Sequence, residues 1–177
     1  MMMLLRKLAR DNRAAAVIEL ALIAPIVATT VVGIVDLSSA FSRKLALEQG
    51  AQRAIEKIMQ TTEDATVENT LKAEAVCQVN GTNTNGSCKS TPITTSDVTV
   101  TYRLDCTVKS TGIVVSTTTT DPAAFSLLTC TAGLVTARYM SITVLDKYTP
   151  MFPVHFSGYN TSDGTYHISA TAGMRTS

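Results

Sequence analysis

The sequence predicts an α+β protein in which a long N-terminal helix, transmembrane and then amphipathic, packs on a small antiparallel β-sheet head. Three observations predict this fold class. A run of 22 apolar and small residues extends from Ala14 to Val35 with a single charge inside it. Residues 36–60 continue with a helical period near 3.6. From about residue 91 onward, Thr, Val, Ile and Tyr alternate with a period of two, which is typical of strands.

The apolar run is long enough to cross a membrane. A helix of that length reaches about 33 Å, and the hydrocarbon core of a bilayer is about 30 Å thick. Four cations precede it, Arg6, Lys7, Arg10 and Arg13, against one acid, Asp11. Because cations flanking a span stay in the cytoplasm, we expect residues 1–14 to be a basic cytoplasmic leader and residues 15–35 to be the transmembrane helix.

An export signal is the competing interpretation of residues 1–40. A secretory signal peptide also begins with cations and turns apolar, but its apolar region is usually about 7–15 residues long. The run here is longer, and it contains Glu19 and Pro25. Small residues follow at 38–40, where a signal peptidase site is an open alternative.

Glu19 is the one charged residue in the apolar run. A carboxylate near the centre of a membrane helix costs roughly 2.5–3.5 kcal/mol on insertion scales, and less toward an interface. Such residues usually pair with a cation or mark a functional site. The sequence therefore identifies Glu19 as a candidate site residue, for which a cationic partner is expected.

Residues 36–76 are expected to extend the helix beyond the membrane. Gly50 is the one helix breaker in residues 36–60, and Lys44 and Glu48 are spaced to form an ion pair. A further helical stretch is predicted from Glu68 to Val76. The residues expected to share the apolar side facing the head are Leu37, Phe41, Leu45, Ala51, Ile55, Ile58 and Met59.

The remaining residues, 77–177, are expected to form the antiparallel β head. Its predicted strands are residues 97–106, 112–120, 137–149 and 165–176. Pro150, Pro153 and two glycines lie between the last two strands and predict a long connection there.

The four cysteines all lie on the predicted outward side of the membrane. An even number in an exported domain indicates two disulfides, for which three connectivities exist. Cys77 and Cys88 bracket a loop rich in Asn and Gly, which turns easily, so we favour Cys77–Cys88 together with Cys106–Cys130. A zinc site is disfavoured because the chain has no CxxC pair.

The composition favours neither catalysis nor nucleic-acid binding. The formal net charge is +1, and no basic stripe with interleaved aromatic residues is present. Ser157, Asp163 and the two histidines, His155 and His167, are close in sequence, but they match no hydrolase or metalloprotease motif. We therefore expect no enzymatic activity and no cofactor.

The segment from Arg13 to Pro25, RAAAVIELALIAP, resembles the N-terminus of TadE-like pseudopilins, the minor pilins of tight-adherence (type IVc) pili. The family pattern is a basic leader, a small residue and A-V-E-F-A-L-x-x-P. In this family a prepilin peptidase cuts after the small residue and leaves Glu at the fifth position. The resemblance implies a cut between Ala14 and Ala15, with Glu19 fifth. Ala14 stands where the family usually has Gly, and Leu20 where it has Phe.

A second resemblance lies at the other end of the chain. The stretch VTARYMSITVLDKYTPMFPV, followed by GTYHISATAGMRTS, is similar to the closing hairpin of TadE-like proteins. The two resemblances cover roughly residues 10–60 and 134–176, and they imply a type IV pilin-like fold. Some larger relatives carry a metal-binding D-x-S-x-S motif. Here the stretch from Asp36 to Ala40 departs from that motif at its last position, so no metal ion is implied.

The resemblance implies a minor pseudopilin that is built into a pilus or located at its tip. The implied partners are the major pilin, other minor pseudopilins, the inner-membrane assembly platform and the prepilin peptidase. The implied location is the bacterial inner membrane, as a single span with the C-terminal domain in the periplasm, and the extracellular pilus after assembly. The alternative is a Sec-exported or membrane-tethered periplasmic binding domain that uses residues 1–40 as its signal or anchor.

Overall fold

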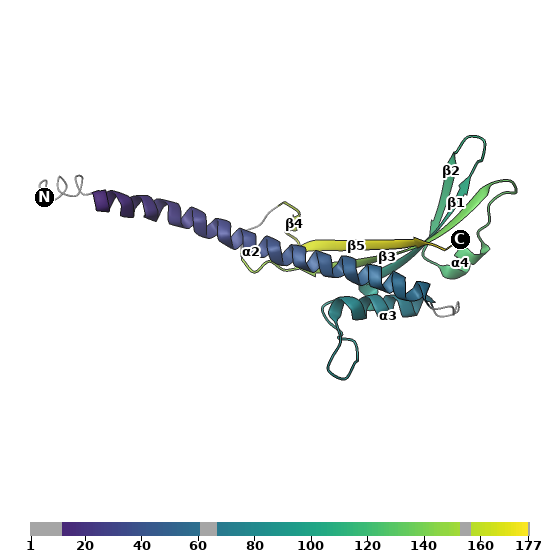
Figure 1. Ribbon diagram of the computed structural model, residues 1–177, viewed down its shortest axis with the longest axis horizontal. Helices are drawn as coiled ribbons and strands as arrows, with labels where there is room; N and C mark the ends of the chain where they lie inside the picture. Colours follow the sequence, from purple (N-terminus) through teal and green to yellow (C-terminus); the bar gives the residue numbers. More distant parts are fainter. Residues whose placement is uncertain (1–11, 61–66, 153–156, 177) are drawn as a thin grey trace, which may run out of the picture.

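The computed structural model describes residues 12–60, 67–152 and 157–176 (Figure 1). Most of the predicted leader, with Arg6, Lys7 and Arg10, lies outside these residues, and so does His155. The described helices and strands follow in chain order: α2 (Asn12–Met59), α3 (Val67–Asn80), the 3-10 turn η1 (Thr95–Asp97), β1 (Val98–Thr107), β2 (Val114–Thr119), α4 (Pro122–Leu127), β3 (Val135–Tyr148), β4 (Tyr159–Asn160) and β5 (Thr165–Arg175).

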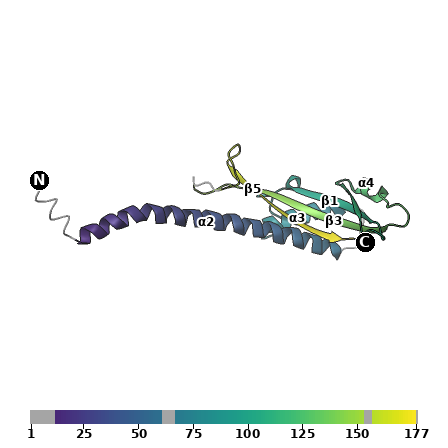
Figure 2. The same cartoon turned by 90° about the horizontal axis from the view of Figure 1, so that it is seen from above.

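The predicted fold class is confirmed. The strands form one antiparallel sheet in the order β2-β1-β3-β5-β4, and α2 and α3 pack side by side against one face of it (Figure 2). Each of the four predicted strands is present within a few residues of its expected bounds, and the predicted helical stretch from Glu68 to Val76 lies within α3.

The first part of α2 extends far beyond the sheet (Figure 1). Residues 16–31, which we call the projecting segment, are exposed on every side of the helix. The helix is long and apolar enough to cross a membrane, with a mean hydropathy of 2.3 over its most apolar window, of which 6% is buried. Because so little of it is buried, the segment is not a core helix of the head, and it fits a membrane anchor.

The second part of α2 forms the core together with α3 and the sheet. Leu47, Ala51 and Ala54 are 0% exposed on α2, as is Leu71 on α3. Alternate residues of the strands complete the core because successive side chains point to opposite faces of a sheet. The strand residues in this core are Val98, Val100, Tyr102, Met140, Ile142, Val144 and Ala170.

The side of α2 that faces the sheet differs in part from the predicted one. Ala51, Ile55 and Ile58 are buried in the core as expected, at 0%, 5% and 7% exposure. Leu37, Phe41 and Leu45 are 49%, 57% and 55% exposed, so they do not belong to the core. In this first part of the contact, the face that packs on the head instead runs from Asp36 through Arg43 to Leu47, and it then continues to Ala51, which was predicted. Two of these residues are charged, and for that reason an apolar pattern could not identify the face.

The four cysteines form two disulfides, Cys77–Cys88 and Cys106–Cys130, which is the pairing that the sequence favours. The first joins α3 to the loop that follows it. The second joins the end of β1 to the segment before β3.

Helix α4 was not predicted. It begins after Asp121, whose side chain accepts a hydrogen bond from the Ala123 N–H, and Pro122 occupies its first turn. Phe125 of this helix stacks on Tyr102 with 5.1 Å between ring centroids. An Asp before a Pro is a recognised start signal for a helix and could have revealed α4.

Candidate assembly site

Glu19 lies on the projecting segment and is exposed. It is the only charged residue between Ala16 and Val35. Within the part of the chain that the structure describes, no ion pair or hydrogen bond to its side chain is present. The carboxylate is therefore available to a group outside this subunit.

Ala14 and Ala15 belong to the first turn of α2, which begins at Asn12. Glu19 is four positions after Ala15, so the two lie about one helical turn apart, with a rise of roughly 6 Å. An amine at residue 15 and the carboxylate of residue 19 would then lie one turn apart on the same side of the helix.

Asp36 ends the apolar run and is the one buried charged residue among the described residues, at 4% exposure. Its carboxylate accepts three hydrogen bonds. The Tyr148 hydroxyl donates to Oδ1 over 3.0 Å, and the backbone N–H groups of Met151 and Phe152 donate over 2.8 and 3.1 Å. Asp36 thereby fixes the end of β3 and the loop after it to the helix, at the point where the helix leaves the apolar run.

Burial and the hydrogen bond to Asp36 both affect the pKa of Tyr148. Burial, together with the hydrogen bond to the Asp36 carboxylate, raises the pKa of Tyr148 above its ordinary value. The hydroxyl therefore stays protonated and remains a hydrogen-bond donor throughout the physiological pH range.

Arg43 makes the second polar contact between α2 and β3. Its Nε donates to Asp146 Oδ2 over 2.5 Å, and the Asp146 side chain is only 7% exposed. Arg43 lies seven residues after Asp36, which is two helical turns, so both charged side chains occupy the same face of α2. We call Asp36 and Arg43, with their partners Tyr148 and Asp146, the polar anchor.

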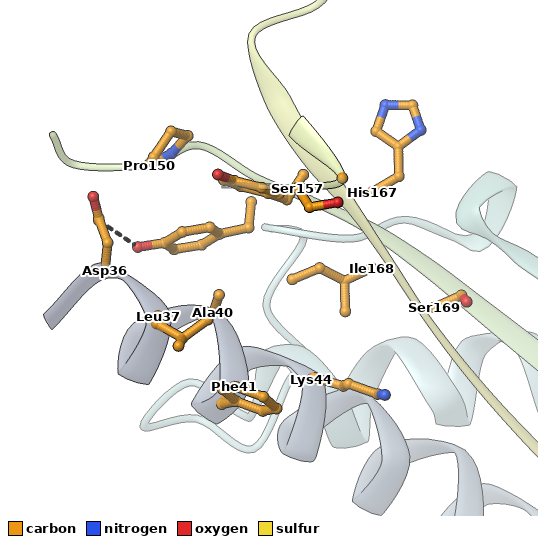
Figure 3. Close-up of a pocket in the computed structure, with 13 residues that line it drawn as sticks. Asp36, Leu37, Ala40, Phe41, Lys44, Pro150, Ser157, His167, Ile168 and Ser169 are labelled. Atoms are coloured by element: carbon orange, nitrogen blue, oxygen red, sulfur yellow. Dashed lines mark hydrogen bonds between the residues drawn. The ribbon is translucent and has the colours of Figure 1, made fainter. Parts of the chain in front are cut away.

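A groove of about 370 Å³ opens beside the polar anchor, between α2 and the strand β5 (Figure 3). Leu37, Ala40 and Phe41 form its helical side, and Ile168 and Ser169 lie on the opposite side. In Figure 3 the ring of His167 points away from these residues. The helical side of the groove is therefore apolar at these three residues, with Asp36 and Lys44 also lining it, and no set of catalytic side chains converges among the described residues of its lining.

His167 interacts with Asp163 rather than with a nucleophile. The His167 Nε2 and Asp163 Oδ2 atoms lie 2.6 Å apart, and Lys147 Nζ lies 3.0 Å from the same oxygen. The hydrogen bond with His167, aided by Lys147, holds the pKa of Asp163 well below its usual range. Among the described residues, no hydrogen bond joins Ser157 to His167, so this group has the form of a surface ion-pair cluster.

A comparison with protein families finds a match that lies within helix α2. Residues 14–55 match the family described as TadE-like protein. This segment is TadE-like. No match was found among curated proteins or among solved structures.

The match begins at Ala14, one residue before the expected mature N-terminus, and it includes Glu19, Asp36 and Arg43. The TadE-like segment thus contains the projecting segment and the helical half of the polar anchor. A TadE-like segment indicates a component associated with tight-adherence pili, with pilus-related partners and a membrane association. Members of this family are structural components of pili and are not known as enzymes. The resemblance at residues 134–176 lies outside the match and stays a prediction.

The roles of Glu19, Ala14 and Ala15, which the sequence singled out, stay predictions. The sequence analysis did not identify the contacts of Asp36 and Arg43 with the head. The partners of both residues lie more than a hundred positions later, with separations of 103 for Asp146 and 112 for Tyr148. One signal was present in the sequence: a charge at the end of an apolar run, followed seven residues later by an opposite charge on the same helical face.

Proposed function

We propose that this protein is a minor pseudopilin, a structural and assembly component of a bacterial tight-adherence pilus. The observation that carries this proposal is the isolated, exposed carboxylate of Glu19 on an apolar helix that projects from the head. A prepilin peptidase would cut between Ala14 and Ala15 and create a free amine one turn from Glu19. The Ala15 ammonium of one subunit would then pair with Glu19 of its neighbour.

This pairing supplies a driving force for assembly. A charged carboxylate and a charged amine are each costly in a hydrocarbon environment, and they cost less when they neutralise each other. Extraction from the membrane therefore becomes more favourable in the assembly than for a single subunit. The partners would be the major pilin, other minor pseudopilins and the inner-membrane assembly platform, and the head would lie in the periplasm before assembly.

The state of the N-terminus tests the processing step. We expect protein from a host with its prepilin peptidase to begin at Ala15, and protein from a peptidase-deficient host to keep residues 1–14. Intact-mass measurement and N-terminal sequencing distinguish the two. Ala14→Gly serves as the matched control because it restores the residue that the family usually has at this position, and it should be processed at least as completely. An intact leader in both hosts would refute the cleavage.

The role of Glu19 is tested by incorporation into pili. We expect Glu19→Ala and Glu19→Gln to insert into the membrane normally, because both remove a charge from an apolar segment. We also expect both to be lost from sheared pilus fractions, measured by immunoblotting against the membrane fraction. Glu48→Gln, an acid farther along the same helix, is the control and should be incorporated like the wild type. Incorporation of Glu19→Gln at the wild-type level would contradict the pairing.

The alternative function, a secreted periplasmic binding domain with residues 1–40 as its signal, receives less support. A mature start near Phe41 would cut inside α2 and remove Asp36 with its three hydrogen bonds to Tyr148 and the following loop. The groove beside α2 would also lose Leu37 and Ala40 from its wall. Protein that begins near Phe41 would establish this alternative in place of the first.

A further inference from the structure

The loop after β3 exposes two large apolar side chains close to the expected membrane boundary. Met151 is 61% exposed and Phe152 is 37% exposed. Isolated exposed apolar residues are ordinary on protein surfaces, so exposure alone carries no argument. The position of these two residues relative to the membrane span is what distinguishes them.

Their position follows from the hydrogen bonds to Asp36. The backbone N–H groups of Met151 and Phe152 lie 2.8 and 3.1 Å from the Asp36 carboxylate. Asp36 directly follows the apolar run, which reaches about 33 Å and so matches the hydrocarbon core. The headgroup layers extend roughly 5–7 Å beyond that core on each side. Both residues are therefore held within the headgroup layer next to the span.

The neighbouring residues have the character of a membrane interface. Tyr148, which donates to Asp36, is the type of aromatic residue that gathers at the level of lipid headgroups. Leu37, the next residue of α2, is 49% exposed and continues the apolar surface of the helix past Asp36. The exposed apolar surface of α2 thus extends past Asp36, the residue that holds the backbone of Met151 and Phe152.

We propose that Met151 and Phe152 insert into the headgroup region of the membrane and form a second lipid contact of the unassembled protein. The partner is the lipid surface that surrounds the projecting segment. Two attachment points, the span and this loop, fix the tilt and the rotation of the head above the bilayer. The inference rests on the membrane anchor in the proposed function, and it adds that the head itself touches the lipid.

The absence of tryptophan from the sequence allows a direct test. Single substitutions Met151→Trp and Phe152→Trp each introduce a unique fluorescent reporter into the full chain. The proteins are reconstituted into vesicles of phosphatidylethanolamine and phosphatidylglycerol, with lipids that carry quenching bromine atoms either near the headgroup or near the chain ends. Ile26→Trp in the projecting segment and Val115→Trp, which replaces an exposed residue of β2 on the head, are the matched controls.

We expect the reporters at positions 151 and 152 to emit at shorter wavelengths than the reporter at Val115, and to lose intensity most strongly with bromine near the headgroup. Ile26→Trp should be quenched more by bromine near the chain ends, and Val115→Trp by neither. If both loop reporters behave like Val115→Trp while Ile26→Trp is quenched, the lipid contact of the loop is refuted and the proposed function stands. If Ile26→Trp is not quenched either, the membrane anchor fails, and both proposals fail with it.

Discussion

Asp36 illustrates how one residue joins the two parts of this molecule. Its carboxylate satisfies the Tyr148 hydroxyl and two backbone N–H groups while it is almost completely buried. Each hydrogen bond to Asp36 contributes only modestly to the free energy of folding. Removing the carboxylate would cost more, because it would leave buried donors without an acceptor. Asp36 therefore determines where the head sits on the helix.

We expect Asp36→Ala to lower the free energy of unfolding by roughly 2–4 kcal/mol, because three donors lose their acceptor. Tyr148→Phe removes one donor and leaves the other two bonds intact, so it should cost about 1 kcal/mol. Chemical denaturation of the full chain in mild detergent, followed by near-ultraviolet circular dichroism, measures both values.

Glu48→Ala is the matched control for Asp36→Ala, because it also removes an acid from α2. The Glu48 side chain is 43% exposed, and its Oε1 atom lies 3.8 Å from Lys44 Nζ. We therefore expect Glu48→Ala to lower the free energy of unfolding by less than about 0.5 kcal/mol. An Asp36→Ala variant that is as stable as the Glu48→Ala variant would show that the polar anchor contributes nothing to the fold.

Helices α2 and α3 approach each other closely at Gly50. A Cβ atom at this position would lie 2.3 Å from Val79 Cγ2 and 3.3 Å from the Val79 backbone nitrogen. The residue that looks like a helix breaker in the sequence is therefore required by packing between two elements. Farther along the same contact, Lys57 and Gln78 both donate to Glu74, over 2.5 and 2.7 Å. Although burial raises the pKa of Glu74, these hydrogen bonds outweigh it and hold the pKa below its ordinary value.

We expect Gly50→Ala to lower the free energy of unfolding by roughly 1–2 kcal/mol. The overlap with Val79 outweighs the gain in helix propensity, which is at most about 1 kcal/mol. In a Val79→Ala background the overlapping methyl group is gone, and the same substitution should be neutral or stabilising. Denaturation of the four proteins in this double-mutant cycle measures the coupling. An equal effect of Gly50→Ala in both backgrounds would contradict the close approach.

At the scale of the whole molecule, one helix serves two environments. Apart from Glu19, the projecting segment carries no charge on any side. The second part of α2 is apolar only where it faces α3 and the sheet, and along the exposed stripe of Leu37, Phe41 and Leu45. Because α2 is one helix from Asn12 to Met59, no loop separates the projecting segment from the part that packs on the head. In the pilus of the proposed function, the exposed stripe would be available to neighbouring helices.

Two leucines of α2 that are two positions apart, and therefore face opposite sides of the helix, separate the two roles. Leu47 is 0% exposed in the core and Leu45 is 55% exposed on the stripe. We expect Leu47→Ala to cost about 2–5 kcal/mol of unfolding free energy, since it leaves a cavity. Leu45→Ala, the matched control, should cost less than about 0.5 kcal/mol. Similar losses at both positions in denaturation of the full chain would mean that the helix packs on the sheet with a different face.

The sequence by itself determined the fold class, the positions of the four long strands along the chain, the length of the apolar helix and the isolation of Glu19. These follow from local patterns, because hydrophobic period and run length are set by neighbouring residues. Only the tertiary structure decided which face of α2 meets the sheet. That face is held by Asp36 and Arg43, two charges whose partners lie more than a hundred residues away. A charged residue is usually expected to face solvent, so the sequence favoured Leu37, Phe41 and Leu45 in the first part of this face. Farther along the helix, Ala51, Ile55 and Ile58 are buried as predicted.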